Sequence, residues 1–186
     1  MIFAETERLY LRTLEREELP RMRELLNDWE IARWLTMLPF PYMSRDAEEF
    51  YIDMAARYAR NEPQFYALAL KTDNLIIGGV GLHPPRFPDH AEGEVEVGYW
   101  LAPLFWGRGL MSEAAREAVK IAFARPTTLC VGATTDIHNR ASQNVLRKAG
   151  LRDMGIVPRN YRALRGADHV TRWFVTRDDY EKEQAA

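Results

Sequence analysis

The segment Glu94–Ala114 constrains the fold more than any other part of the chain. It contains, in order, a strand-like run Glu94–Leu101, a short loop with a proline, a Gly-X-Gly turn at Gly107–Gly109, and a helix beginning near Leu110. Glycines let the backbone approach a ligand closely, and the first N–H groups of a helix have no intrahelical acceptors. Because these donors also lie at the positive end of the helix dipole, the segment predicts a phosphate-binding turn.

Length and charge limit the class of protein. A chain of 186 residues predicts one domain, which we place at residues 1–180 with 181–186 as a short tail. The formal net charge of −2 argues against bulk binding of nucleic acid. The single cysteine, Cys130, excludes an intrachain disulfide and is compatible with a reducing compartment. The sequence shows neither a signal peptide nor an apolar run of about 20 residues. We therefore expect a soluble, cytoplasmic protein without membrane contacts.

Hydrophobic periodicity predicts an α+β domain. Alternation and turn residues indicate strands near residues 8–14, 65–71, 75–82, 94–101, 128–134, 153–162 and 169–177. Helical spacing indicates helices near 19–26, 29–35, 44–58, 110–124 and 139–149. This order predicts a mixed, mostly antiparallel sheet of about seven strands with helices on both faces. The strand–helix–strand unit across 94–134 would supply its parallel pair.

Six segments appear in an order that resembles the GNAT superfamily of acyl-CoA-dependent N-acetyltransferases. The likeness is closest to the branch of ribosomal-protein N-terminal acetyltransferase-like enzymes, and it covers nearly the whole chain. The segments are Thr6–Arg12, Pro39–Tyr42, Ile77–Gly78, Glu96–Leu101, Phe105–Ala114 and Asn139–Gly150. The resemblance implies a three-layer GNAT fold that binds acetyl-CoA as co-substrate and needs no metal.

The resemblance also implies where acetyl-CoA binds, which is between two splaying parallel strands, 94–101 and 128–134. The pantetheine arm would pair with Tyr99, Trp100 and Leu101, and Asn139 and Ser142 would meet it near the thioester. The phosphates would contact Lys148 and the turn residues Trp106, Gly107, Arg108, Gly109, Leu110, Met111 and Ser112. Two structural alternatives stay open. Asn139 is also a natural helix N-cap, and Lys148, in the last turn of a helix, interacts favourably with the helix dipole without any ligand.

Acyl transfer from a thioester to an amine requires a neutral amine, a stabilised oxyanion and a leaving thiolate. Strand alternation places Glu96 on one face with Gly98 and Trp100. We expect Glu96 to act as general base through a water molecule, as strand glutamates often do in this family; the alternative is a solvated charge on a half-exposed strand. The oxyanion would be met by a backbone N–H near Trp100 or Leu101.

The proton donor is the point at which this chain departs from the family pattern. Many relatives have a tyrosine seven residues after the asparagine, where this chain has Leu146. Ser142 is the candidate donor to the departing sulfur, although it could be only an exposed serine of the first helical turn. Because thiols have a pKa of about 8.5, weak assistance would suffice. Met111 is a second departure, since the branch usually has a small residue there.

The acceptor is expected to be a primary amine, either a small molecule or a protein N-terminus. Trp34, Tyr42 and His83 are the candidate acceptor contacts, and a homodimer would follow from family analogy alone. A dinucleotide-binding oxidoreductase fits poorly, because Ser112 occupies the position of the third glycine of its fingerprint. A non-catalytic acyl-CoA-binding module of the same fold is the remaining alternative.

Overall fold

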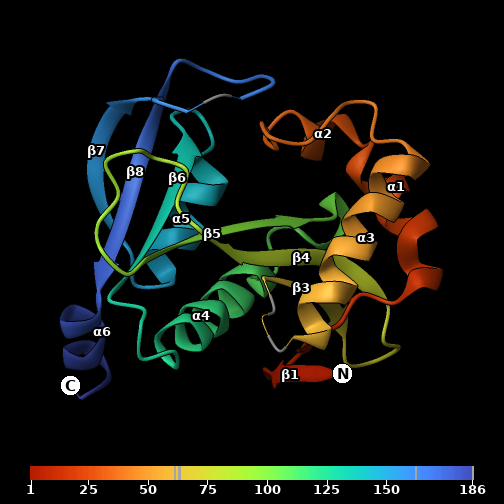
Figure 1. The fold of residues 1–186 in the computed structure, drawn as a ribbon, viewed down its shortest axis with the longest axis horizontal. Coiled ribbons are helices and arrows are strands. Elements are labelled where there is room, and N and C mark those ends of the chain that lie inside the picture. The colour runs from red at the N-terminus through yellow and green to blue at the C-terminus, as the bar shows by residue number, and fades with distance from the viewer. Residues whose placement is uncertain (61, 63, 162, 186) are drawn as a thin grey trace.

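An eight-stranded sheet crosses the computed structural model, which describes residues 1–60, 62, 64–161 and 163–185 (Figure 1). Its order is β1-β2-β3-β4-β5-β6-β8-β7. The strands are β1 (Ile2–Glu5), β2 (Leu9–Arg12), β3 (Phe65–Leu70), β4 (Ile76–His83), β5 (Glu94–Leu101), β6 (Cys130–Asp136), β7 (Arg152–Pro158) and β8 (His169–Thr176). All neighbours pair antiparallel except β5 and β6, which are parallel. The predicted mixed, mostly antiparallel sheet is confirmed, with β1 as the additional strand.

Helices cover both faces of the sheet, as the sequence predicted. They are α1 (Leu19–Leu26), α2 (Trp29–Ala32), α3 (Ser44–Ala59), α4 (Leu110–Phe123), α5 (Arg140–Lys148) and α6 (Arg177–Gln184). Two short 3₁₀ helices, Arg16–Glu18 and Pro103–Phe105, precede α1 and the glycine turn.

Strand alternation sorts the core into two layers. On β3, Tyr66 and Leu68 belong to the core that α4 and α5 cover, whereas Phe65 and Ala67 belong to the core that α1 and α3 cover. The small-residue face of α4, which includes Ala115, lies directly on the sheet because alanine side chains permit a close approach. The result is the three-layer arrangement expected for the chain.

Two elements were not predicted, for local reasons. Strand β1 has only four residues and a bulge in its pairing with β2, so it offers too little alternation to recognise. Helix α6 has no buried residue and hence no apolar stripe; it begins at the N-cap Thr176 and places Tyr180 on Phe123, with ring centroids 4.7 Å apart. Strand β7 ends at Pro158, before the predicted limit, and Arg162 lies outside the described residues.

Candidate active site

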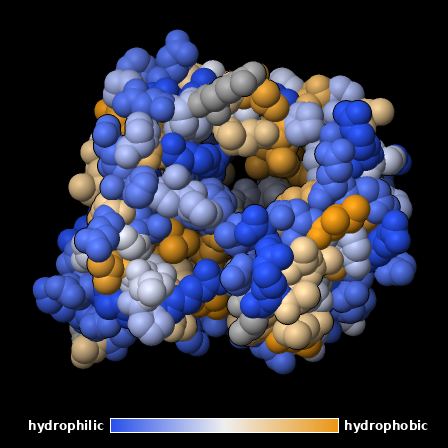
Figure 2. Space-filling view, in the orientation of Figure 1, coloured by the Kyte–Doolittle hydropathy of each residue, from blue (hydrophilic) through white to orange (hydrophobic). Residues whose placement is uncertain are grey.

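The sheet opens between β5 and β6. These strands pair only from Glu94, opposite Cys130, to Glu96, opposite Gly132. Both strands continue, to Leu101 and Asp136, without further pairing to each other. The facing edges beyond Glu96 therefore hold backbone groups that the β5–β6 ladder does not use. The two halves of the sheet diverge at this point (Figure 1), and the surface is hollowed between the half that carries β6–β8 and the half that carries α1–α3 (Figure 2).

The glycine turn beside this opening has the geometry predicted for it. Gly107 and Gly109 have φ angles of +74° and +77°, a left-handed backbone conformation that residues with a Cβ rarely adopt. The first i to i−4 bond of α4 runs from the Glu113 N–H to the Gly109 carbonyl, at 3.1 Å. Helix geometry therefore leaves the N–H groups at the start of α4 without intrahelical acceptors.

Arg8, in the loop before β2, contacts both the glycine turn and the first turn of α4. Its Nη1 donates to the Arg108 carbonyl at 2.9 Å, and its Nη2 lies 2.6 Å from Glu113 Oε2. Burial works against ionisation of Glu113, but hydrogen bonds from Thr6 and Arg8 prevail and lower the pKa of this carboxyl. The Thr6–Arg12 segment, singled out by the resemblance, thus holds the phosphate-type turn in place.

Two cavities meet at the opening of the sheet. One of about 530 Å³, here called the turn arm, lies between the glycine turn, the edge of β5 and the start of α5. Every residue predicted to contact the coenzyme lines the turn arm except Arg108, whose guanidinium instead lies over the Phe105 ring at 5.6 Å. Trp106 also donates from Nε1 to the Leu101 carbonyl at 2.7 Å, which fixes its indole at the edge of β5.

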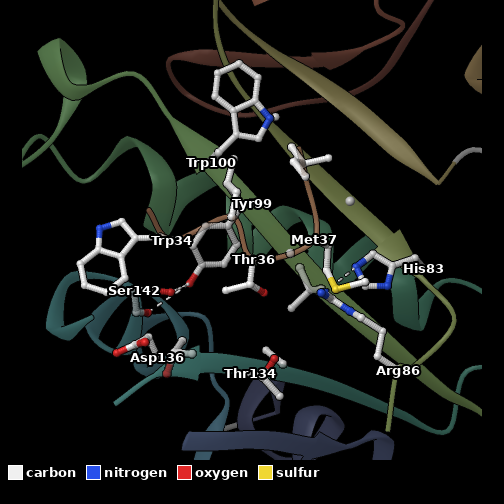
Figure 3. Close-up of a pocket in the computed structure, with 18 of the residues that line it drawn as sticks. Trp34, Thr36, Met37, His83, Arg86, Tyr99, Trp100, Thr134, Asp136 and Ser142 are labelled. Atoms are coloured by element: carbon white, nitrogen blue, oxygen red, sulfur yellow. Dashed lines mark hydrogen bonds between the residues drawn. The ribbon is translucent and has the colours of Figure 1, made fainter. Parts of the chain in front are cut away.

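The second cavity, of about 420 Å³, lies over the face of β4 and β5 and is here called the sheet arm (Figure 3). All three predicted acceptor residues line it. Trp34 also lines the turn arm. Tyr42 is only 4% exposed and donates to the Asp46 carbonyl at 3.2 Å, so it forms part of the wall. Burial raises the pKa of the Tyr42 phenol to about 12.

Tyr99 and Ser142 lie where the two arms join, since both residues line both cavities. The Tyr99 hydroxyl donates to the Ser142 carbonyl at 3.1 Å and lies 3.0 Å from Ser142 Oγ. Burial raises the pKa of Tyr99, so its phenol stays protonated at neutral pH. Asn139 Oδ1 accepts from the Ser142 N–H at 3.0 Å. Asn139 is therefore a helix N-cap and a cleft residue at once.

Glu96 lines neither arm. Its side chain is 1% exposed, and Arg86 Nη2 lies 3.0 Å from Oε1. The Arg86 backbone N–H donates to Oε2 at 3.0 Å, and Thr134 Oγ1 lies 3.5 Å from Oε1. The alternative of a solvated surface charge is wrong, because the carboxylate is buried and ion-paired. Its role as general base stays a prediction, and Arg86 stands between it and the sheet arm.

His83 lies at the far end of the sheet arm from Tyr99, beside Arg86 (Figure 3). Arg86 Nη2 donates to His83 Nε2 at 3.2 Å, which assigns the ring hydrogen to Nδ1, 3.1 Å from the Pro84 carbonyl. Burial and the neighbouring guanidinium lower the pKa of His83, and Glu96 offsets this only in part. The imidazole is therefore neutral at pH 7.

The sheet arm also contains Arg159 and four residues that the sequence did not single out: Arg86, Thr134, Asp136 and Tyr161. Thr134 Oγ1 lies 3.3 Å from the Tyr161 hydroxyl, which connects β6 to the segment after β7. These residues come from separate loops and strand ends, so no local motif marks them. The one available signal was position along the strand, since Thr134 and Asp136 follow Gly132, the last residue of β6 that pairs with β5.

Leu146, at the position of the family's tyrosine, and the single cysteine, Cys130, are both buried. Leu146 is 1% exposed and packs in the core beneath α5. Burial, with a smaller contribution from Glu94, raises the pKa of the Cys130 thiol to about 11.

Among the described residues, no group of three or more His, Cys, Asp or Glu side chains could hold a metal ion. No helix within the described part of the chain is long and apolar enough to cross a membrane.

Comparisons with known proteins agree with this architecture. Residues 8–152 match the family model described as "Acetyltransferase (GNAT) domain". The uncharacterised N-acetyltransferase p20 of Bacillus licheniformis is 26% identical over 163 residues, covering 87% of this chain and 88% of p20.

Two solved structures illustrate the shared fold. The ribosomal-protein-S5-alanine acetyltransferase of Vibrio fischeri superimposes with a TM-score of 0.77 at 18% identity, covering 95% of this chain and 97% of that one. RimJ of Mycobacterium smegmatis, solved in complex with CoA-disulfide, gives a TM-score of 0.73 at 16% identity, covering 95% of this chain and 88% of RimJ. The family match spans most of the sequence, and it includes the glycine turn and the splayed strands. The chain therefore belongs to the acetyltransferase (GNAT) family and is an N-acetyltransferase.

Proposed function

We propose that the protein transfers the acetyl group of acetyl-CoA directly to a primary amine within a ternary complex. The observation that carries this proposal is the junction of the two arms at Tyr99 and Ser142. A thioester entering through the turn arm would reach the same point as an amine entering through the sheet arm. The sheet opening thus lets two substrates meet without a covalent enzyme intermediate.

The turn arm fits coenzyme A in shape and in chemistry. The unpaired edge of β5 offers backbone groups to the two amides of pantetheine. The start of α4 offers N–H donors and a helix dipole to the pyrophosphate. Lys148 lines the same arm and adds a cation for a phosphate. The RimJ structure holds a CoA-disulfide, which supports coenzyme A as the ligand of this fold.

Proton transfer to the leaving thiolate falls to the hydroxyl groups of Tyr99 and Ser142. Both lie at the junction of the arms, 3.0 Å apart, and both are protonated at neutral pH. This pair replaces the tyrosine that many relatives carry at the position of Leu146. A backbone N–H near Trp100 or Leu101 would stabilise the oxyanion, because amide donors fixed in a strand need no reorganisation.

Glu96 positions the acceptor side of the site rather than touching the amine. It fixes Arg86, and Arg86 in turn fixes His83. A neutral amine enters the reaction already deprotonated, and the α-amino group of a peptide has a pKa of only about 7.7–8.0. A direct base is therefore least needed for an acceptor of that kind, such as a protein N-terminus or a weakly basic small amine.

A covalent acetyl-enzyme has little support. The Cys130 thiol is buried at 3% exposure, and its raised pKa disfavours the thiolate. Ser142, whose hydroxyl lies at the junction of the arms, is hydrogen-bonded to Tyr99 rather than to a base. The transfer therefore needs both substrates bound together.

The test is release of free thiol from acetyl-CoA in the presence of amines and of peptides with free N-termini, followed at several concentrations of both substrates. Intersecting double-reciprocal lines are expected for a ternary complex, whereas parallel lines would refute direct attack. Thermal stabilisation by acetyl-CoA should accompany the activity, by about 2.7 kcal/mol at 100 times Kd. Binding of acetyl-CoA without consumption by any acceptor would favour the non-catalytic module.

A further inference from the structure

Strands β4 and β5 contain four glycines that differ in what surrounds them. A Cβ added to Gly78 would lie 2.5 Å from the Trp100 carbonyl oxygen. A Cβ added to Gly79 would lie 2.4 Å from the Phe65 ring. At both positions packing excludes any larger residue. Packing therefore explains two of the four glycines.

Gly81 and Gly98 are different. They are register partners on β4 and β5, so they lie side by side on the face that the sheet arm covers. A Cβ at Gly81 would come no closer than 3.5 Å to any atom, and one at Gly98 would lie 3.4 Å from His83 Nε2. Neither has a positive φ, so any residue could adopt either backbone conformation. Glycine weakens a strand interior, and nothing in the protein itself requires it here.

The bare strip formed by Gly81 and Gly98 is the floor of the sheet arm. Its width is that of two strands, roughly 4.8 Å between their axes. Phe65 and Trp100 stand at one end of the strip, and the neutral His83 stands at the other. A flat group that lay on the strip would contact backbone below and aromatic rings at its side. Branched or bulky groups would not reach the floor.

The charges of the sheet arm restrict the acceptor further. Its charged lining residues are Arg86, Arg159 and one acid, Asp136. Arg86 is already ion-paired with the buried Glu96, and His83 is neutral, so two guanidinium groups face two carboxylates in and beside the arm. A polyamine carries several ammonium groups, and Asp136 is the one carboxylate of this lining that could pair with them, because Glu96 lies outside the lining and is paired with Arg86. An acceptor with one amine and an uncharged flat substituent needs only one such partner.

We propose that the Gly81–Gly98 strip is a specificity subsite that takes a flat, apolar substituent of a mono-amine acceptor, next to the reacting nitrogen. The proposal rests on the function proposed above, because it assigns the sheet arm to the acceptor. It adds a substrate class, namely aromatic mono-amines. It also adds two specificity-determining positions, Gly81 and Gly98. Substitution by alanine at either position would fill the subsite while leaving the turn arm unchanged.

The test is calorimetric binding of 2-phenylethylamine, ethylamine and spermidine to the CoA-loaded protein, as wild type, Gly81→Ala and Gly98→Ala. Affinity for 2-phenylethylamine should fall roughly 10-fold or more in either variant, since one methyl group fills the space that the substituent occupies. Affinity for ethylamine, which has no ring, should be the same in all three proteins. Gly79→Ala serves as a packing control: it should lower the unfolding temperature, whereas Gly81→Ala and Gly98→Ala should not.

Three results would overturn the proposal: no binding of 2-phenylethylamine by the wild type, equal affinity in wild type and both variants, or tighter binding of spermidine than of 2-phenylethylamine. Turnover is measured separately by thiol release from acetyl-CoA. Ring-dependent binding that the alanine variants weaken, without any acetyl transfer, would retain the subsite and refute the proposed reaction.

Discussion

Replacing Glu96 with glutamine separates a catalytic from a positioning role for this carboxylate. The side chain is 1% exposed and receives hydrogen bonds from the backbone and the guanidinium of Arg86. Glutamine retains one acceptor oxygen but removes the negative charge that faces the guanidinium. The change is nearly isosteric, so it perturbs the charge and hydrogen bonding without opening a cavity.

The expected cost to stability follows from this environment. Hydrogen bonds to charged groups contribute about 1.5–3 kcal/mol, and Arg86 is partly exposed, so water can replace part of the lost interaction. We expect a loss of about 1–3 kcal/mol in the free energy of unfolding. For a chain of this length that corresponds to a decrease of roughly 2–12 °C in Tm. Thermal unfolding followed by circular dichroism measures it.

The expected cost to activity separates the two roles. Loss of a general base lowers kcat/KM by about 10²–10⁴-fold and removes the corresponding limb of the pH profile. As a positioning residue, Glu96→Gln should lower kcat/KM by less than about 100-fold and keep that limb. Acetyl-CoA affinity should not change, because Glu96 does not line the turn arm.

Glu94→Gln provides the matched control. Glu94 is also a buried carboxylate on β5, ion-paired with Arg172, but it lines neither arm of the cleft. It should lose comparable stability with little change in the kinetics of acetyl transfer. The positioning argument would be refuted if Glu96→Gln left Tm unchanged while lowering kcat/KM by 10² or more, with loss of a pH limb.

Three further outcomes test other parts of the site. Gly109→Ala should lower Tm by roughly 2–8 °C, since a left-handed conformation costs a residue with a Cβ about 1–2 kcal/mol. Gly109→Asn should lower Tm by less, and equal Tm values for the two variants would contradict the conformational explanation. Tyr99→Phe combined with Ser142→Ala should lower kcat at acetyl-CoA saturation at least about 10-fold, as single-turnover rates would show. Unchanged kcat would exclude the hydroxyl pair as proton donor. The lowered pKa of Glu113 predicts stability that is present above its unfolded pKa, about 4.3, and lost as pH falls through the folded value. Urea unfolding at pH 7 and pH 3 should show that Glu113→Gln removes part of this dependence.

The turn arm could be predicted from the sequence because its chemistry is local. Two contiguous segments, Tyr99–Ser112 and Asn139–Lys148, supply most of its lining. The groups proposed to bind coenzyme A are largely backbone donors, whose positions follow from a strand end, a glycine turn and a helix start. Such geometry depends on residue types at fixed spacing, which a single sequence displays.

The sheet arm could not be predicted in the same way. Its walls come from α1, the 34–42 segment, β3 to β6, α5, the segment after β7 and the start of β8. Which of these segments adjoin is decided by strand order, and no local pattern encodes that β6 lies between β5 and β8. Alternation placed Glu96 on the correct face of β5. It gave no indication that Arg86, ten residues before it, would return from the loop after β4 to cover the carboxylate.

The division of the cleft into two arms has a consequence for how acceptor specificity can change. The arms share Trp34, Leu35, Tyr99, Trp100, Asn139 and Ser142 and otherwise have separate linings. Substitutions at Gly81 or in the segment after β7 can therefore alter the acceptor without moving the glycine turn or the start of α4. Under the proposed function, coenzyme binding would constrain one set of residues and acceptor binding another, so the two could diverge independently. In this fold, likeness at the turn arm is consequently stronger evidence for the donor substrate than for the acceptor.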